Sequence, residues 1–296
     1  MWPPEYAASG KQAPVVVDVW ADNEEEELAH ISRGLLVDFP IAVVATYQDL
    51  PARPLRDAGH LAFHDNVYHV VHSPRHTLEH HCRVLQDRIR GVRFFQLVLA
   101  LLDRDGAVAL GRVWRFHVGA PLPADDRLLL ELGVEPPARR RVHRDHIGTA
   151  LKGCNAIHNT AVTWVTCDGA DDVCHLMSCF DDPEIVRQVS NRMNFVRNSR
   201  SFFPQLYDLR FLAEWRTLAG EEPPLAAAAR AGGPAALLHG FLALMKEPTF
   251  AEQMEGYNGI LFGIGHLDTP DVVNRHKMSH EERQRRYRME FCRKRC

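Results

Sequence analysis

The chain has 296 residues, with 35 Lys and Arg against 38 Asp and Glu, so its formal net charge is −3. A hydrophobic fraction of 46% and a charged fraction of 25% are typical of a globular protein and exclude a wholly disordered or collagen-like chain. No apolar run reaches the ~18–20 residues of a membrane helix. Residues 1–14 lack the apolar core of a secretory signal, and the seven cysteines form no CxxC pair. We therefore expect a reduced protein of the cytoplasm and nucleus, with no membrane partner.

The first part of the chain predicts two strands around one helix. Residues 1–14 are interpreted as a loose N-terminus, and the apolar stretch 15–20 is extended. An acidic run, Glu24–Glu27, then begins a helix that ends near Leu36, because carboxylates favour the positive end of the helix dipole. We interpret this run as a solvated helix start. The continuous apolar run 41–47 is typical of a strand buried on both faces.

The next part predicts a hairpin. Strands are expected over 95–102 and 109–118, joined at 103–106, where an Asp-Gly step favours the positive φ of a tight turn. Residues 59–92 show no clear period, and we interpret them as a loop and one helix over 77–89.

The following elements alternate between strand and helix. The basic run Arg139–Arg144 is interpreted as a linker-like surface segment. A strand is expected at 161–166, helices at 171–180 and 183–198, and a short strand at 206–209.

The C-terminal part predicts a last core helix over 235–246 and a basic tail. From Arg275 to Cys296 there are nine Lys or Arg against three Glu, a pattern typical of an exposed helix or a disordered segment. The whole pattern predicts one α/β domain with a mixed central sheet flanked by helices, over 15–268, followed by the tail 269–296.

Several stretches, taken in order, resemble one known family. They are Val19–Asn23, Asp38–Pro40, Ala52–Pro54, Phe95–Leu99, Val113–Phe116, the plant-like Val162–Thr166, Phe203–Arg210 and Tyr257–Gly263. The chain resembles the Caf-one deadenylases, the exonuclease subunits of the Ccr–Not complex, over about residues 15–266. The resemblance implies a ribonuclease-H-like fold of the DEDD exonuclease superfamily. It also implies poly(A)-specific 3′–5′ exoribonuclease activity, poly(A) RNA as substrate, and the Ccr–Not scaffold subunit and a partner nuclease as contacts.

The chemistry implied by the resemblance needs two divalent ions, Mg²⁺ or Mn²⁺, held by four carboxylates. Such hard cations take oxygen ligands and need several negative charges around them. Carried onto this sequence, the first pair of acids falls on Ala45 and Tyr47, and the last acid falls on Ala235, or on Pro234 in an alternative frame. Arg230 occupies the position of the water-orienting His, and only Asp172 remains as a family acid.

We therefore predict a non-catalytic or regulatory copy that binds no divalent ion tightly. One alternative is a residual metal-dependent deadenylase in which Asp168, Asp171 and Asp172 hold a single ion weakly; these acids also suit the N-terminus of a helix. A second alternative is an RNA-binding module that uses the basic tail and the basic run. The candidate phosphate contacts in that run are Arg139, Arg140, Arg141 and Arg144. A solvated charged surface, or a nuclear-localisation signal in the tail, would explain the same residues.

Two groups of His and Cys residues contain potential metal ligands. Adjacent positions on a helix face different directions, which argues against zinc at His76, His80, His81 and Cys82. We expect the other group to be small buried side chains near the sheet. It comprises Cys167, Cys174, Cys179 and His175.

Overall fold

The computed structural model describes residues 14–32, 35–48, 82, 85, 94–119, 140–167, 169–180, 192–209, 211–212, 257–261 and 264. Its strands are β1 (Val15–Val19), β2 (Ile41–Gln48), β3 (Phe94–Leu102), β4 (Arg112–Gly119), β5 (Thr163–Thr166) and β6 (Gln205–Asp208). Its helices are α2 (Glu24–Ser32), α3 (Leu35–Asp38), α6 (Arg144–Gly153), α7 (Gly169–Met177) and α9 (Arg192–Phe202). None of these helices is long and apolar enough to cross a membrane.

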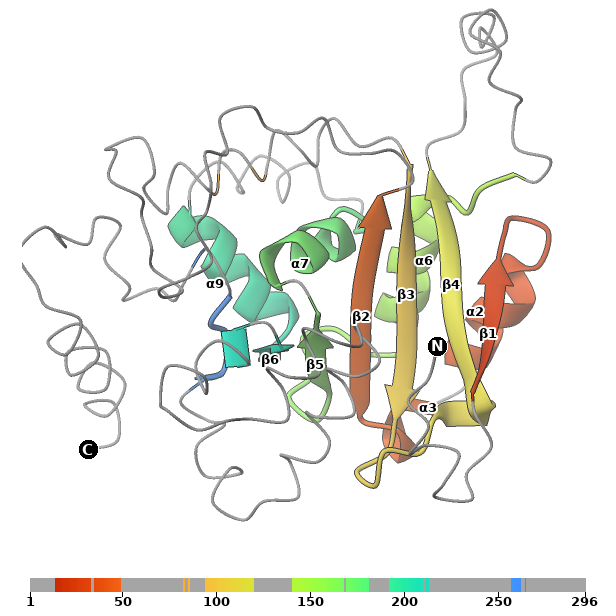
Figure 1. Ribbon diagram of the computed structural model, residues 1–296, viewed down its shortest axis with the longest axis horizontal. Helices are drawn as coiled ribbons and strands as arrows, with labels where there is room; N and C mark the ends of the chain where they lie inside the picture. The colour runs from red at the N-terminus through yellow and green to blue at the C-terminus, as the bar shows by residue number, and fades with distance from the viewer. Residues whose placement is uncertain are drawn as a thin grey trace, which may run out of the picture.

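The six strands form one mixed sheet in the order β1-β4-β3-β2-β5-β6 (Figure 1). β3 is antiparallel to both β2 and β4, whereas β1 runs parallel to β4. β2, β5 and β6 are mutually parallel. The predicted mixed α/β architecture is therefore confirmed. Because the carboxyl ends of parallel strands share one edge, β2, β5 and β6 bring their ends together there.

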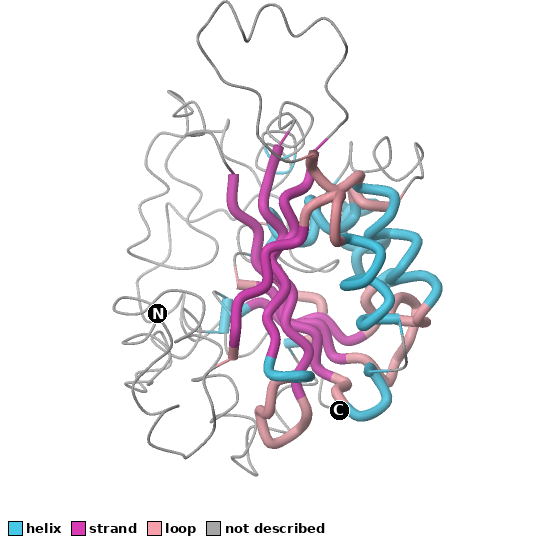
Figure 2. The backbone as a smooth tube through the Cα atoms, turned by 90° about the vertical axis from the view of Figure 1, so that its right-hand side faces the viewer, coloured by secondary structure: helices cyan, strands magenta, loops and turns pink. Residues whose placement is uncertain are grey.

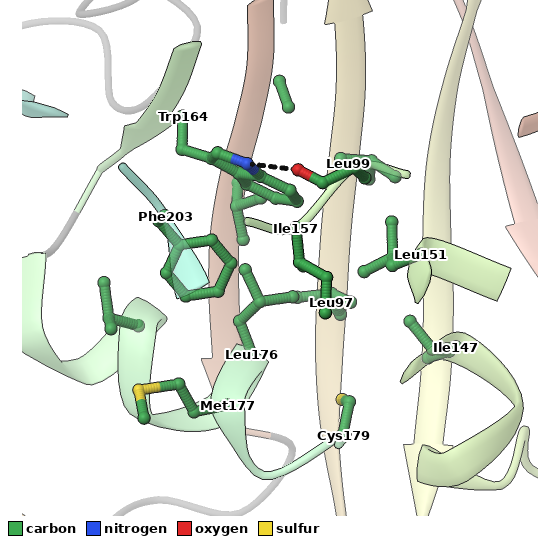
Figure 3. Close-up of a cluster of buried hydrophobic side chains, with 14 of the residues drawn as sticks. Leu97, Leu99, Ile147, Leu151, Ile157, Trp164, Leu176, Met177, Cys179 and Phe203 are labelled. Carbon is green, nitrogen blue, oxygen red and sulfur yellow. Dashed lines mark hydrogen bonds between the residues drawn. The ribbon is translucent and has the colours of Figure 1, made fainter. Parts of the chain in front are cut away.

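The core lies between the sheet and the described helices, most of which gather on one side of it (Figure 2). Alternate residues of β3, namely Phe95, Leu97 and Leu99, are at most 2% exposed, as a half-buried strand requires. They pack with side chains from α6 and α7 (Figure 3). Trp164 of β5 joins this cluster, and its indole N–H donates to the Ala156 carbonyl at 3.1 Å.

The predicted hairpin between β3 and β4 is confirmed. The Asp103 carboxylate accepts hydrogen bonds from the backbone N–H groups of Asp105 (2.9 Å) and Ala107 (2.7 Å), and Gly106 has φ 79°. β4 begins later than predicted, at Arg112, because residues Ala109–Gly111 form a short 3-10 turn.

Two local predictions were wrong. The helix after the acidic run ends at Ser32, and a separate short helix, α3, follows after residues 33–34, which lie outside the described part. The expected linker at Arg139–Arg144 leads directly into α6, a helix that was not predicted. Val142 is fully buried, donates to the His117 carbonyl (2.9 Å) and accepts from the Gly119 N–H (3.1 Å), so this segment extends the packing of β4.

Other predictions lie outside the described residues. These are the loose terminus over 1–13, most of the 77–89 helix, the start of the 183–198 helix, the 235–246 helix and the tail. The domain limits 15–268 stay a prediction.

Candidate functional site

Asp172 lies where the carboxyl ends of β2 and β5 meet the first turn of α7. Its side chain is 1% exposed. Thr46 donates to Asp172 Oδ1 twice, from its backbone N–H and from its hydroxyl, each at 2.7 Å. The backbone N–H of Cys167 donates to Oδ2 at 2.9 Å. Asp172 therefore ties three separate elements together: β2, the segment after β5, and α7.

Ala45 and Tyr47, the positions predicted to have lost the first acid pair, flank Thr46 on β2. Ala45 is buried and has no polar side-chain atom, whereas Tyr47 is 43% exposed. Partial burial, together with the nearby Cys167 and Asp172, raises the pKa of the Tyr47 phenol to about 12. The hydroxyl is therefore neutral near pH 7, as predicted, and supplies no anionic oxygen.

The residues present do not fit the two-ion centre that the resemblance implies. Ala45 offers no ligand, Tyr47 offers a neutral hydroxyl, and both oxygens of Asp172 already accept hydrogen bonds. Within the described ranges, no group of three or more His, Cys, Asp or Glu side chains is placed to hold a metal ion. Asp171 is partly buried beside Asp172 on α7. The other predicted site positions, Asp168, Arg230 and Ala235, lie outside the described residues.

The basic run packs partly against the sheet. The Arg141 guanidinium lies over the Phe94 ring, 4.6 Å from its centre, and Arg144 lies over the Phe95 ring at 5.2 Å. Arg140 is exposed, and Arg139 lies outside the described residues. A role for these arginines in binding nucleic acid stays a prediction.

The expected buried cysteines are confirmed. Cys167, Cys174 and Cys179 are free thiols with little or no exposure, and the buried His175 ring packs 4.6 Å from the Phe95 ring. Burial raises the pKa of Cys174 well above its ordinary value, and it raises that of Cys179 to about 12. These thiols are therefore not activated nucleophiles. Of the four candidate zinc ligands, Cys82 is buried, and the three histidines lie outside the described residues.

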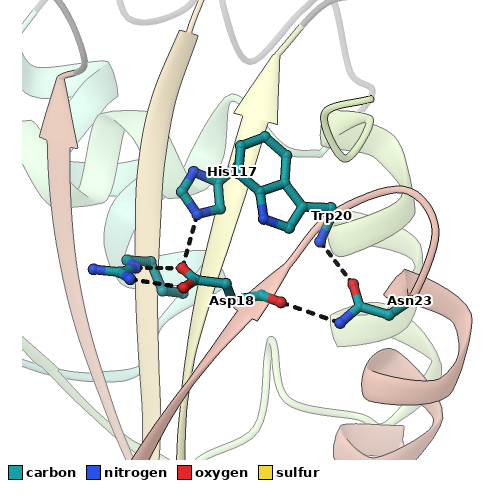
Figure 4. Close-up of polar contacts among 5 residues, drawn as sticks. Asp18, Trp20, Asn23 and His117 are labelled. Atoms are coloured by element: carbon teal, nitrogen blue, oxygen red, sulfur yellow. Dashed lines mark hydrogen bonds and ion pairs between the residues drawn. The ribbon is translucent and has the colours of Figure 1, made fainter. Parts of the chain in front are cut away.

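A polar cluster between β1 and β4 was not predicted (Figure 4). Asp18 accepts from Arg115 Nε at 2.6 Å and Nη2 at 2.8 Å, and His117 Nε2 lies 2.8 Å from Asp18 Oδ1. The Trp20 indole stacks on the His117 ring, with centres 3.8 Å apart and planes at 8°. The Arg115 hydrogen bonds, helped by His117, lower the pKa of Asp18 to about 2. The available signal was the spacing of Arg115 and His117, two residues apart on a predicted strand.

The interpretation of the acidic run as solvated was wrong for two of its members. Glu27 is 7% exposed and accepts from Trp114 Nε1 at 2.9 Å and Arg112 Nη1 at 3.1 Å. Glu24 pairs with His146 Nδ1 at 2.7 Å. Residues three apart share one helix face, so the spacing of Glu24 and Glu27 could have indicated an inward pair.

The chain is similar in sequence to a curated plant protein. It is 25% identical over 276 residues to the probable CCR4-associated factor 1 homolog 7 of Arabidopsis thaliana, covering 84% of this chain and 92% of that protein. No family model matches the chain.

Two solved structures have a similar fold. The S. pombe Pop2p structure with Mg²⁺ and Mn²⁺ bound has a TM-score of 0.58 and 19% identity, covering 84% of this chain and 99% of that one. A chain in the structure of the yeast NOT1 MIF4G domain co-crystallised with CAF1 has a TM-score of 0.56 and 17% identity, covering 88% and 99%. The predicted family resemblance and the predicted ribonuclease-H-like fold are both confirmed.

Proposed function

We propose that this chain keeps the fold of the CCR4-associated factor 1 family without its two-metal chemistry, and acts as a non-catalytic or regulatory subunit. The observation that carries the proposal is the side-chain set at the carboxyl end of β2. Ala45 and Tyr47 stand there in place of two acids, and the neighbouring Asp172 is already bonded to Thr46 and Cys167.

The electrostatic requirement of two-metal hydrolysis supports this proposal. Two divalent ions about 4 Å apart repel one another, and a protein holds them only by surrounding them with several anionic oxygens. Ala45 and the neutral phenol of Tyr47 contribute no negative charge. Of the four acid positions that the resemblance implies, only Asp172 carries a carboxylate, which is a poor match for four positive charges.

Stepwise shortening of RNA is the direct test. The purified chain would be incubated with 5′-labelled poly(A) and Mg²⁺ or Mn²⁺, beside an active family enzyme as a positive control. We expect no ladder of shortened products. A ladder that disappears in Asp172→Ala would reject the proposal and support a residual one-ion deadenylase.

The second part of the proposal concerns partners. The yeast relative CAF1 is co-crystallised with the NOT1 MIF4G domain. We infer that this chain docks on the corresponding Ccr–Not scaffold, and by the same resemblance contacts the partner nuclease. Five described free cysteines fit the reducing cytoplasm or nucleus in which such a complex would assemble.

Capture of the chain by the purified scaffold domain tests this second part separately. Specific capture without nuclease activity supports a docking subunit. Absence of capture, with a folded chain, would overturn the scaffold inference and leave the inference about catalysis untouched.

A further inference from the structure

The two ends of the sheet differ in charge. The β1 end has the acidic side chains of β1 and α2, whereas α9, which leads into β6 at the other end, contains three arginines and no acid (Figure 1). The segment 154–162, which leads into β5, has no acid either. Because the whole chain has a net charge of −3, the excess of cations beside β5 and β6 is local and does not reflect the overall composition.

Three exposed basic side chains define this surface: Lys152 in the last turn of α6, His158 in the loop that follows, and Arg197 in the middle of α9. Two phenylalanine rings connect the first two of them. Lys152 Nζ lies 5.6 Å from the centre of the Phe180 ring, and the rings of Phe180 and Phe202 have centres 5.2 Å apart. The His158 ring lies 4.8 Å from the Phe202 ring. Lys152 and His158 therefore lie on either side of one aromatic cluster.

His158 is fixed to the end of α9 by two hydrogen bonds. Its backbone N–H donates to the Phe202 carbonyl at 2.8 Å, and its Nδ1 lies 2.7 Å from the Ser201 carbonyl oxygen. Since a carbonyl oxygen only accepts, Nδ1 carries a proton and the ring is held in one orientation. Residues four apart on a helix are neighbours, so Arg197 stands beside Ser201 on the same side of α9. The three basic side chains thus form a row from α6 to the middle of α9.

Folding accounts for only part of this basic row. Lys152 and His158 lie at the C-terminal ends of α6 and α9, where a cation complements the helix dipole. Arg197 is in the middle of α9, away from either helix end, and its side chain is exposed. Among the residues that the structure describes, no acid forms an ion pair with it. The charge of Arg197 is therefore directed to solvent, where an anionic ligand can reach it.

We propose that the basic row, Lys152, His158 and Arg197 around the partly buried Phe202, binds the phosphate backbone of single-stranded nucleic acid without need of a divalent ion. Proteins bind single strands through basic surfaces with interleaved aromatic rings, because phosphates contact the cations and bases stack on the rings. An acidic protein segment would meet the charges but would not stack on Phe202. The row lies at the amino ends of β5 and β6, at the opposite edge of the sheet from Asp172, and the proposal rests on neither part of the proposed function.

Fluorescence anisotropy of labelled poly(A) and poly(U), titrated with the full chain in EDTA at several salt concentrations, tests the proposal. We expect both polymers to bind, with an affinity that falls as salt rises. Lys152→Gln combined with Arg197→Gln should reduce the slope of log affinity against log salt by about 1.4, because each lost phosphate contact removes about 0.7. The matched control combines Arg104→Gln and Arg140→Gln, two exposed arginines outside the row, and should leave the slope unchanged. No binding at low salt, or a slope lowered only by the control pair, would overturn the proposal.

A second variant separates nucleic acid from an acidic protein segment as the ligand. Phe202→Leu keeps an apolar side chain against the core but removes the ring. It should weaken poly(A) binding by about fivefold or more and leave the salt slope unchanged, because stacking on a ring does not depend on charge. Circular dichroism verifies that each variant is folded. If labelled polyglutamate bound as tightly as poly(A), and Phe202→Leu weakened neither, the assignment of nucleic acid as the ligand would be rejected.

Discussion

Replacing Asp172 with Ala should destabilise the fold whether or not divalent ions are present. The carboxylate is 1% exposed and accepts three hydrogen bonds, two from Thr46 and one from Cys167. A hydrogen bond to a charged group contributes about 1.5–3 kcal/mol, and a buried donor left without an acceptor costs about 1–3 kcal/mol. Since these effects are not additive, we expect a loss of about 3–5 kcal/mol in the free energy of unfolding.

Urea unfolding followed by tryptophan fluorescence measures this loss, with and without Mn²⁺. Thr46→Val removes only the hydroxyl donor and should cost about 1–2 kcal/mol, whereas Thr46→Ser keeps the donor and should cost less. The double variant Thr46→Val with Asp172→Ala should lose less than the sum of the two single losses, because both remove the same hydrogen bond.

If Asp172→Ala did not destabilise the ion-free chain, Asp172 would instead be identified as a metal ligand. Removing an acid from a cluster of metal-binding carboxylates relieves their repulsion, so the ion-free protein becomes no less stable. If Asp172→Ala were neutral without ions, while Mn²⁺ raised the melting temperature of the unmodified chain alone, the structural role argued for Asp172 would be refuted.

Three other predictions concern groups with shifted pKa values. The pKa of Asp18 falls from 3.8 to about 2, so the stability that it contributes is present above pH 4 and is lost as the pH falls towards 2. With the side chain 39% exposed, solvent screening reduces this contribution to about 1 kcal/mol. Asp18→Asn should flatten that part of a stability–pH curve, and an unchanged curve would refute it. The Tyr47 phenol should titrate near pH 12 in the ultraviolet difference spectrum between the unmodified chain and Tyr47→Phe, and stability should decline as the pH rises beyond 10. A midpoint near 10 would contradict the partial burial of this phenol. Cys174 and Cys179 should resist iodoacetamide at pH 8 until urea unfolds the chain. Peptide mass spectrometry would detect the labelling. Rapid labelling of both thiols in the folded chain would disprove the packing of α7 and the residues that follow it.

Strands were predictable where their burial is continuous. Residues 41–45 of β2 are buried in succession, and β3 packs on the helices and is buried throughout its C-terminal half, so both strands have long apolar runs. The predicted ranges differ from the observed ones by one residue at an end. The Asp-Gly turn between β3 and β4 was likewise a local signal. α6 was missed because its apolar face shows only Ile147 and Leu151 after a basic run, whose arginines pack on aromatic rings instead of facing water.

Contacts between distant segments were beyond sequence reasoning. Glu27 is buried because Trp114 and Arg112, 87 and 85 residues away, supply its donors. Asp172 meets Thr46 across 126 residues. Taken alone, the acidic segments around Glu27 and Asp172 have a composition that solvent-exposed segments also have. Only the order of the strands in the sheet brings these acids next to their hydrogen-bond donors. The family motif predicts Asp172 as a site residue, but it gives no indication of the hydrogen-bond donors that surround it.

The hydrogen bonds of Asp172 explain why one acid persists at a site where two of the other positions carry none. A buried carboxylate must be compensated, either by cations or by hydrogen-bond donors. In this chain the N–H groups of Thr46 and Cys167, the Thr46 hydroxyl and the start of α7 provide donors and a positive dipole end. Asp172 is therefore stable without an ion, and its replacement would break the junction of β2, β5 and α7. Its hydrogen bonds thus give Asp172 a structural role that does not depend on a metal ion.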